Sequence, residues 1–528
     1  MFSTSPEAVV LGKVAAQGSL LQTRLMRHRL VTKGSFYERL ADHGHEFISD
    51  DDFAGLYAKE KGRPSIPPSV VVRALLCATH DNIASDRETS RRTRVDSDWK
   101  AAMGVDDWFE GIGATTFSLM RARMVLHDAD ATLFEATLAK AVATGVFKGK
   151  LTAIIDSSPV HGAGAMADTF ELVRKLAGRL ARAMGGHLDA DLTAEALAAA
   201  AVKPDIDWQD PAARRAQLEK MVVLALHMLD AADASDVADD AAVVEAADLL
   251  AQVIDQDVEV DGVRLAIRDG VAPDRVISHS DPEMRHGRKS ASRRFDGHKM
   301  DVIVDEDTEL VLGVDVRAGN AGDGEGAVPL LEQVQNLPGI EVETLLGDMA
   351  YSDGDVREAV EEHGVELVAK VPPVTNSGRF PKTDFVVDNE NKTVTCPAGN
   401  TTATARKIKD HKGRPATAYT FDPAMCAACP LREQCTTSAK GRQIIVGRHH
   451  DRIEKARKAQ VEPDTKTLLR RRPKVERKID HLQDLGMRKA RFRGRRKTRL
   501  QALLAATVAN FKRLVVLDAF TNIAAVAA

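Results

Sequence analysis

The chain is poor in aromatic residues and cysteine, and it has no long apolar run. Aromatics make up 4% of the 528 residues, which excludes a long base-stacking platform, so any nucleic-acid contact should run through Lys and Arg to phosphate. Five cysteines exclude a disulfide scaffold. No apolar stretch could span a membrane, and Lys13 lies where a signal peptide would be apolar, so we expect a cytoplasmic protein without a membrane contact. No glycine-rich phosphate loop occurs, so ATP use is not indicated.

The composition, 44% apolar and 28% charged, is that of a globular protein, and the length suggests about three structural units. The net charge of −4 conceals two stretches of strong and opposite charge. Residues 189–261 contain 18 acidic and 4 basic residues, whereas residues 455–499 contain 18 basic and 5 acidic ones. The basic stretch predicts a partner with dense negative charge.

Residues 1–145 are predicted to form a helical domain. Apolar spacing indicates helices at 70–79 and 117–127, the second capped by Thr116, and a capping-box pair, Ser85 and Glu88, opens an arginine-rich helix at 85–95. Short helices of this kind fit a helix-turn-helix-like DNA-binding unit, and an ordinary solvated basic face explains the arginines equally well.

Residues 146–528 are predicted to form an α/β domain, because strands alternate with helices along the chain. Residues 160–275 form an acidic helical insertion, with helices at 188–202 and 218–250, and residues 385–445 form a small cysteine-rich β insertion. Residues 285–294 are predicted as a basic loop. The expected strands are 151–155, the hairpin of 297–304 and 310–316, then 343–346 and 366–371. The expected helices are 356–363, 473–485 (ending at Gly486) and 500–514.

Three carboxylates follow or begin these elements. Asp156 and Asp348 each come directly after a predicted strand, and Glu476 lies in the first turn of the helix at 473–485. Carboxylate oxygens on rigid elements suit Mg²⁺, and two such ions can promote phosphodiester cleavage. Spacing alone leaves a simpler explanation open for each: a turn or cap for the aspartates and a surface salt-bridge cluster for Glu476. The competing carboxylates are Asp281, Asp296 and Asp301.

Four of the cysteines cluster late in the chain. Cys426 and Cys429 form a CxxC pair flanked by Cys396 and Cys435, which is enough for one tetrahedral Zn²⁺ site. Because a second CxxC is missing, a set of reduced thiols in a small β insertion is an equal alternative. The fifth, Cys77, lies in an apolar helix and is interpreted as core.

Four stretches resemble the insertion-sequence transposases of the DDE class found in bacteria. They are the helical block from Phe36 to Arg121, the strand end Ile155-Asp156-Ser157, the segment from Gly347 to Ser352, and the segment from Arg472 through Glu476 to Leu514. The resemblance implies a ribonuclease-H-like mixed sheet with helices on both faces. It also implies that Asp156, Asp348 and Glu476 are catalytic and hold Mg²⁺ or Mn²⁺, and that a homodimer cuts terminal inverted repeats and joins them to target DNA.

The resemblance has two departures. Where the family has a Tyr and a Lys on the last catalytic helix, this chain has Leu469 and Gln483, so strand-end contacts should come from other residues. The expected DNA-binding residues are Arg472, Arg488, Lys489, Arg491, Arg493, Arg495, Arg496, Arg288, Lys289, Arg293 and Arg294. A metal-dependent nuclease of the same fold and a non-catalytic DNA-binding protein derived from a transposase stay open as alternatives.

Overall fold

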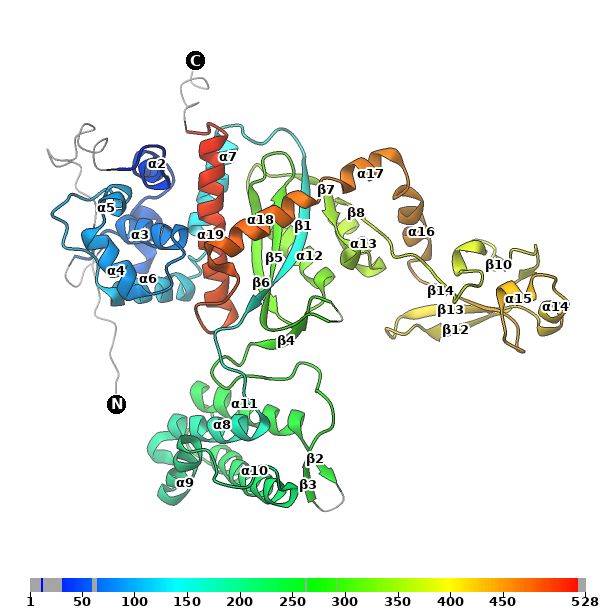
Figure 1. The fold of residues 1–528 in the computed structure, drawn as a ribbon, viewed down its shortest axis with the longest axis horizontal. Coiled ribbons are helices and arrows are strands. Elements are labelled where there is room, and N and C mark those ends of the chain that lie inside the picture. Colours follow the sequence, from blue (N-terminus) through cyan, green and yellow to red (C-terminus); the bar gives the residue numbers. More distant parts are fainter. Residues whose placement is uncertain (1–10, 13–30, 59–63, 262–263, 291, 521–528) are drawn as a thin grey trace.

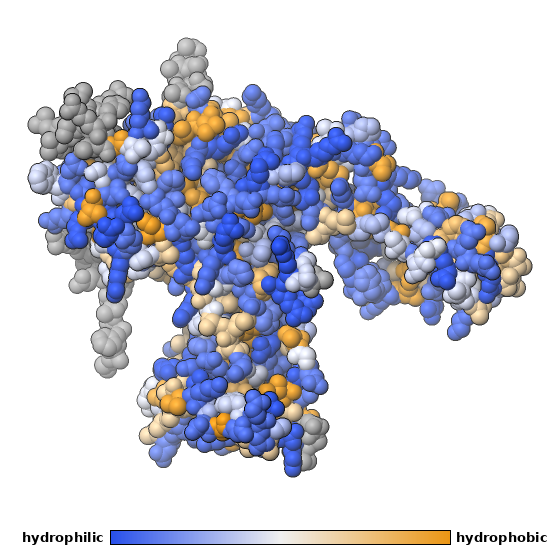
Figure 2. Space-filling view, viewed as in Figure 1, coloured by the Kyte–Doolittle hydropathy of each residue, from blue (hydrophilic) through white to orange (hydrophobic). Residues whose placement is uncertain are grey.

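The structure is a computed structural model that describes residues 11–12, 31–58, 64–261, 264–290 and 292–520. Lys13 lies outside them. Three lobes surround a central sheet: a helical domain, a helical bundle and a small β module (Figure 1). The face shown in Figure 2 is largely hydrophilic, with apolar residues in scattered small patches. None of the helices in the described ranges combines the length and the apolar character needed to cross a membrane.

The central sheet is mixed, which confirms an α/β fold. Within it β5 pairs antiparallel with β1, β4 and β6, whereas β7 runs parallel to both β1 and β8. The strand order is therefore β4 and β6 beside β5, then β1, β7 and β8. The six strands are β1 (Leu151–His161), β4 (Arg285–Arg288), β5 (Arg294–Asp305), β6 (Val311–Ala318), β7 (Val342–Gly347) and β8 (Glu366–Ala369).

Two sequence-based predictions about these strands were wrong. The first strand does not end at residue 155 but continues through Asp156 to His161, because its second half pairs with residues 297–301 of β5. The basic segment 285–294 is not a loop but a hairpin, since β4 pairs with the start of β5. The predicted hairpin of residues 297–304 and 310–316 is confirmed as β5 and β6.

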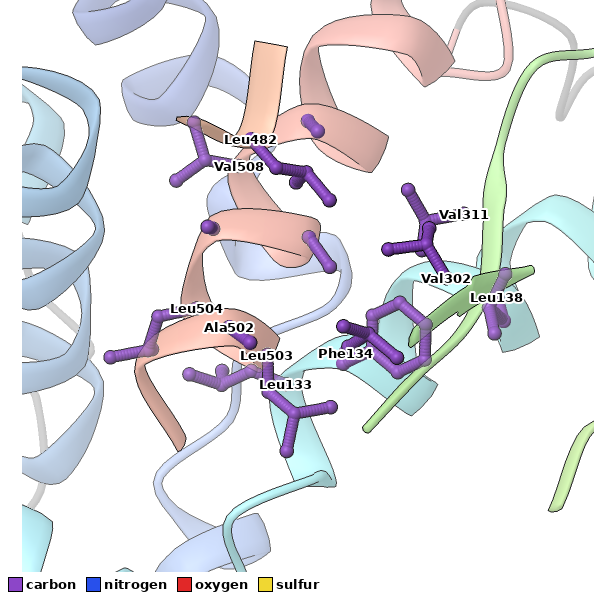
Figure 3. Packing of buried hydrophobic residues seen from close by; sticks show 14 of the residues in the cluster. Leu133, Phe134, Leu138, Val302, Val311, Leu482, Ala502, Leu503, Leu504 and Val508 are labelled. Atoms are coloured by element: carbon purple, nitrogen blue, oxygen red, sulfur yellow. The ribbon is translucent and has the colours of Figure 1, made fainter. Parts of the chain in front are cut away.

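Helices cover both faces of the sheet. On one face lie α7 (Thr132–Ala143), α18 (Pro473–Leu482) and α19 (Arg495–Val516), and on the other lie α12 (Ala327–Gln335) and α13 (Gly354–Glu362). Figure 3 shows Leu503 and Val508 of α19 among side chains of α7 and of strands β5 and β6. The buried amide of Asn510 accepts a hydrogen bond from the Val311 N–H (2.8 Å) and donates one to the Val311 carbonyl (2.9 Å), which ties α19 to β6.

The N-terminal helices pack against α19. As predicted, Ser85 caps α4, since its side chain accepts a hydrogen bond from the Glu88 N–H. The predicted cap at Thr116 was wrong, because α6 begins earlier, after Gly113. These helices are α2 (Phe36–His43), α3 (Pro68–His80), α4 (Asp86–Val95), α5 (Ser97–Met103) and α6 (Ala114–Leu126).

The acidic segment forms a helical bundle with a hydrophobic core of its own. The single helix predicted over 218–250 is interrupted at residues 234–240, and Asp240 caps the next helix. The elements are α8 (Thr169–Met184), α9 (Ala190–Ala201), α10 (Pro211–Asp233), α11 (Ala241–Asp257), β2 (Val258–Asp261) and β3 (Arg264–Ile267).

The cysteine-rich segment forms two three-stranded antiparallel sheets around a core of only six buried side chains. Its elements are β9 (Val386–Asp388), β10 (Thr393–Thr395), β11 (Thr401–Thr402), β12 (Ala405–Lys409), β13 (Pro415–Thr420), α14 (Pro423–Ala427), α15 (Arg432–Cys435) and β14 (Gln443–Gly447). Helices α16 (His450–Ala459) and α17 (Pro463–Leu469) lead from this β module back to α18 (Figure 1).

Candidate active site

The strand register brings Asp156 and Asp348 to the same level. In the parallel pair of β1 and β7, Ile154 is the partner of Leu346, and each aspartate lies two residues further along its own chain. Residues two apart share a face, and neighbouring strands are about 4.8 Å apart. The two carboxylates are therefore neighbours on the α18 side of the sheet.

Helix α18 carries Glu476 beside them. Proline at its first position and the apolar stripe of Val475, Ile479 and Leu482 fix which face of the helix packs on the sheet. One flank of the helix reaches β1: the Gln483 amide donates a hydrogen bond to Ser158 Oγ (2.9 Å).

Arg472, at the cap of α18, lies on the same flank as Glu476 and Gln483. One of its guanidinium nitrogens is 3.8 Å from Asp156 Oδ2. Its Nε is buried and makes no hydrogen bond to any described residue.

Asp348 and Glu476 lie close enough to Asp156 to act on its charge. Burial raises the pKa of Asp156 to about 6, and the negative charges of Asp348 and Glu476 add to the rise, against the opposing effects of the Ser157 N–H and Arg472. A carboxylate in such a setting lacks sufficient positive charge nearby. Strongly perturbed carboxylates of this kind are typical of functional sites.

The donor chemistry of this group suits a hard divalent cation, because all the donors are carboxylate oxygens and their charges repel one another. As placed, however, no three carboxylate, histidine or cysteine side chains of the described ranges stand close enough together to enclose a metal ion. The site is thus a convergence of compatible ligands rather than a closed coordination sphere.

A buried layer supports β1 from the opposite face. Ser157 Oγ and Lys299 Nζ both donate to Asp323 Oδ1, each at 2.7 Å. Tyr351 is fully buried next to this layer and its hydroxyl has no partner among the described residues. Burial raises the pKa of Tyr351, and the charges of Asp301 and Asp156 raise it further. Sequence reasoning missed this layer, because its members lie far apart in the chain.

The three competing carboxylates all have other roles. Asp281 accepts a hydrogen bond from the Gly494 N–H (3.2 Å). Asp296 contacts His286 Nδ1 at 2.6 Å, and Asp301 pairs with Arg317. The carboxylates that act most on Asp156 are instead Asp348 and Glu476.

The expected DNA-binding residues fall into two sets. Six of them are exposed and make no ion pair within the described part of the chain: Arg288, Lys289, Arg293, Arg294, Lys489 and Arg493. The first four lie at the tip of the β4–β5 hairpin.

The other set contacts the protein itself. Arg495 pairs with Glu283 at 3.0 Å, Arg488 with Asp484 at 3.1 Å, and Arg496 with Asp128. Arg491 donates to Asn82 Oδ1 (2.6 Å) in the N-terminal domain. Arg491 thus joins the C-terminal stretch to the N-terminal domain, and much of the basic charge of that stretch joins parts of the same molecule.

The four late cysteines line one small cavity of about 20 Å³, although Cys396 is 30 residues from the nearest of the others. All four are free thiols. Burial raises the pKa of Cys435, the neighbouring Arg442 lowers it, and the other three cysteines raise it further. The thiols are therefore near neighbours, although they do not stand at metal-ligand geometry as placed.

Two protein-family models match the chain. The family described as "Transposase DDE domain" matches residues 395–515, and the family described as "Transposase domain (DUF772)" matches residues 25–123. Both descriptions are of transposase domains, and the two matches support an insertion-sequence transposase of the DDE class. No curated protein and no solved structure gives a significant match.

The matched segments cover the two ends of the molecule and not its middle. The DDE match contains Glu476, the four late cysteines and the whole basic stretch of residues 455–499, whereas Asp156 and Asp348 lie outside it. The evidence that these two aspartates lie near Glu476 is therefore the strand register and the electrostatics of Asp156.

Proposed function

We propose that this protein cuts the ends of a transposable element and joins them to target DNA, with Asp156, Asp348 and Glu476 as the metal-holding catalytic residues. The observation that carries the proposal is the meeting of these carboxylates from β1, the end of β7 and α18, together with the raised pKa of Asp156. The strand order and directions of the sheet support a ribonuclease-H-like fold. The location of Asp156 on the first strand, of Asp348 directly after β7 and of Glu476 on a later helix is consistent with such a fold.

The carboxylates would hold Mg²⁺ or Mn²⁺, which supplies an activated water or 3′-hydroxyl and stabilises the leaving oxygen of the phosphodiester. Gln483, through Ser158, holds α18 against β1, so that Glu476 keeps its distance from the aspartates. Arg472 offsets part of the negative charge beside Asp156. At the position where the family has Lys, Gln483 thus contacts strand β1 of the protein's own sheet.

DNA is the partner that the charge distribution favours. The exposed cations of the β4–β5 hairpin, with Lys489 and Arg493, would contact phosphates, which sets position and affinity rather than sequence. The N-terminal helices would recognise the terminal inverted repeat, as a homodimer on DNA in the bacterial cytoplasm.

A second metal is proposed for the β module. Cys396, Cys426, Cys429 and Cys435 would hold one structural Zn²⁺, because four thiols around one cavity supply the complete ligand set of a tetrahedral site. A core of six buried side chains is small for a module of this size, and small folds commonly need such a metal for stability.

The function is tested with purified protein and labelled element ends, incubated with Mg²⁺ or with EDTA. We expect Mg²⁺-dependent cleavage and strand-transfer products, both abolished in Asp156→Asn, Asp348→Asn and Glu476→Gln while DNA binding is retained. Asp296→Asn is the matched control and should cleave normally, because Asp296 contacts His286 instead. Cleavage without strand transfer would identify a nuclease, and binding without cleavage would identify a non-catalytic DNA-binding protein.

A further inference from the structure

A cavity of about 320 Å³ lies between the central sheet and the β module. Its walls include Ser352–Gly354, which follow β7, and Val371–Val374, which follow β8. The rest comes from Lys382, which precedes β9, from the β12–β13 turn, and from the end of β14 and α16. Carboxyl ends of parallel strands are the usual place for ligands in open α/β sheets. Asp348 lies on the same edge, four residues before Ser352.

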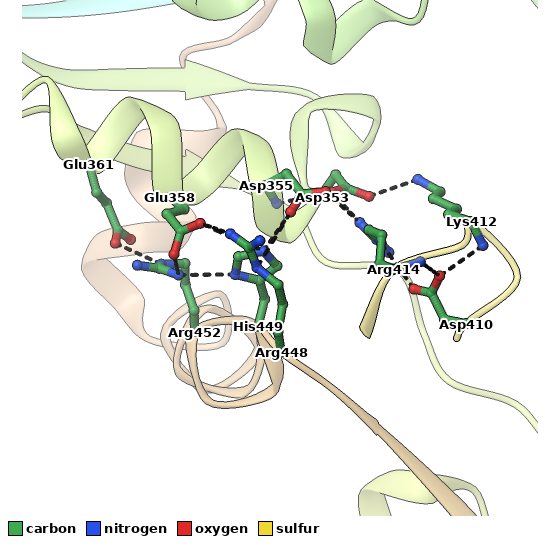
Figure 4. A network of polar contacts seen from close by, with 10 residues as sticks. All are labelled: Asp353, Asp355, Glu358, Glu361, Asp410, Lys412, Arg414, Arg448, His449 and Arg452. Atoms are coloured by element: carbon green, nitrogen blue, oxygen red, sulfur yellow. Dashed lines mark hydrogen bonds and ion pairs between the residues drawn. The ribbon is translucent and has the colours of Figure 1, made fainter. Parts of the chain in front are cut away.

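Most charged groups around this cavity are already paired, as Figure 4 shows. Asp353 contacts Lys412 (2.7 Å) and Arg414 (2.8 Å). His449 Nε2 lies 2.6 Å from Asp355. In the same way Arg448 pairs with Glu358, Arg452 pairs with Glu361 and Glu358, and Asp410 pairs with Arg414. This network fastens the β module to α13, and its cations are therefore not free to bind a ligand.

Two basic side chains of the cavity wall are left over. Lys382 and His450 make no hydrogen bond or ion pair through their side chains with any described residue. Burial lowers the pKa of Lys382, and Arg457 lowers it further against the opposing charge of Glu454. Burial lowers the pKa of His450 too, and Lys382 adds to that effect. Two half-buried basic groups that make no ion pair with a described residue therefore line an open cavity, where the charge of Lys382 disfavours protonation of His450.

Arg457 shapes the same wall. It donates to the Pro372 carbonyl (2.8 Å) and to Glu454 (3.2 Å), which holds the segment after β8 against α16. Glu454, the carboxylate that acts on both Lys382 and His450, is thereby engaged with Arg457. An anion in the cavity would relieve the repulsion between Lys382 and His450 and accept their N–H groups as hydrogen-bond donors.

We propose that this cavity binds a phosphate group, and that the phosphate belongs to the backbone of the DNA strand that crosses the carboxylate site. The choice of DNA rests on the proposed function and on the shared sheet edge with Asp348. The volume lies within the range of small-ligand sites, so a free phosphate or a nucleotide is the other source of the same chemistry. Bound there, the strand would contact the sheet and the β module at once.

Amine acylation read by mass spectrometry tests the site on the full-length wild-type chain. The neutral amine is the reactive form, so a lowered pKa makes Lys382 reactive. We expect a DNA duplex to reduce labelling of Lys382 several-fold while labelling of Lys440, an exposed lysine of the same β module, stays unchanged. Equal labelling of Lys382 with and without DNA would overturn the proposal. Protection by inorganic phosphate or ATP but not by DNA would overturn DNA as the source of the phosphate.

A pair of variants gives an independent readout. Lys382→Met should reduce the slope of log affinity against log salt by about 0.9 for one lost phosphate contact to duplex DNA, whereas Lys440→Met should leave it unchanged. Loss of the unpaired cation should not destabilise the fold, which a thermal melt checks. An unchanged slope in a folded Lys382→Met protein would also overturn the proposal.

Failure of this site and failure of the proposed function give different results. Protection of Lys382 without Mg²⁺-dependent cleavage would reject the catalytic assignment and keep the phosphate site. Cleavage without protection would reject the phosphate site alone.

Discussion

Replacing Asp156 by Asn should stabilise the sheet while abolishing cleavage. Because the folded chain raises the pKa of this carboxyl from 3.8 to about 6, its ionised form costs the folded state up to about 3 kcal/mol. Asparagine removes the charge and keeps an oxygen acceptor for the Ser157 N–H, which now donates to Asp156 Oδ1 at 2.8 Å. Above pH 6 the full gain should be present.

The sign of the pH dependence follows from the raised pKa. Well below the ordinary pKa of 3.8 the wild-type carboxyl is protonated in both the folded and the unfolded chain, so the variant has no advantage there. Between pH 8 and pH 5 the advantage should fall by about half. Amide hydrogen exchange of peptides from β1 and β7 measures the stability of this part of the sheet. A local measurement is needed because the chain has three separate hydrophobic cores, which can unfold separately.

A carboxylate with the opposite shift is the control. Burial tends to raise the pKa of Glu306, but its ion pairs with Lys474 and Arg471 outweigh burial and hold the pKa below its ordinary value. Glu306→Gln should therefore lose stability at neutral pH, and the loss should disappear on acidification.

Mg²⁺ gives a second test of the Asp156 reasoning. Mg²⁺ should protect the β1 and β7 amides of the wild-type chain and not those of Asp156→Asn, because a bound cation supplies the missing positive charge. If Asp156→Asn were less stable than wild type at pH 8, or stabilised equally at pH 5 and pH 8, the electrostatic reasoning would be wrong.

Two further outcomes are expected. Metal analysis should find about one Zn²⁺ per chain, and a zinc-free wild-type chain would refute the site. The Cys426→Ser variant should lose the metal, whereas Cys77→Ala should keep it, since Cys77 is a buried residue of α3. Asn510→Leu should lower the free energy of unfolding by about 2–5 kcal/mol, because the Val311 N–H and C=O lose their partner inside the core. Thr137→Val removes only a 3.2 Å hydrogen bond to the same amide and should cost clearly less in urea denaturation; equal costs for the two variants would contradict this account.

Local patterns predicted the elements well where one pattern dominated. The alternation and apolar runs of β5 to β8 and the spacing of α18 and α19 appear in the structure within a few residues. Asp156 was predicted at the end of a short strand, because Ser157, Ser158 and Pro159 interrupt the apolar run. Pairing with β5 keeps these residues extended, and that partner is more than 130 residues away in the sequence.

The helix ends were predicted less evenly. Gly486 was correctly placed at a break, and its φ of 106° is one that favours glycine. The chain there continues through a π-type turn (Gln483–Met487) rather than stopping, because Leu485 and Met487 are buried in the core. Tertiary packing, which a single helix pattern does not contain, decided that boundary.

The basic stretch shows what a charge count can and cannot predict. An excess of 13 positive charges over residues 455–499 was taken to face DNA, but several of those residues meet carboxylates of this chain. Arg471 and Lys474 contact Glu306, and Arg499 contacts Asp130 and Asp315. The acidic partners lie in the N-terminal domain and in the sheet, far from residues 455–499 in the sequence. A charge count over residues 455–499 therefore cannot predict these ion pairs.

Helix α18 shows how one short segment serves both the core and the site. At 100° per residue, Val475, Ile479 and Leu482 point to the core, while Arg472, Glu476 and Gln483 share the flank that faces β1. Lys474 lies on the opposite flank, where it contacts Glu306 in the turn between β5 and β6. Removing the Glu306 contact should therefore loosen α18 without touching a catalytic oxygen, and the position of Glu476 depends on contacts from both flanks of its helix.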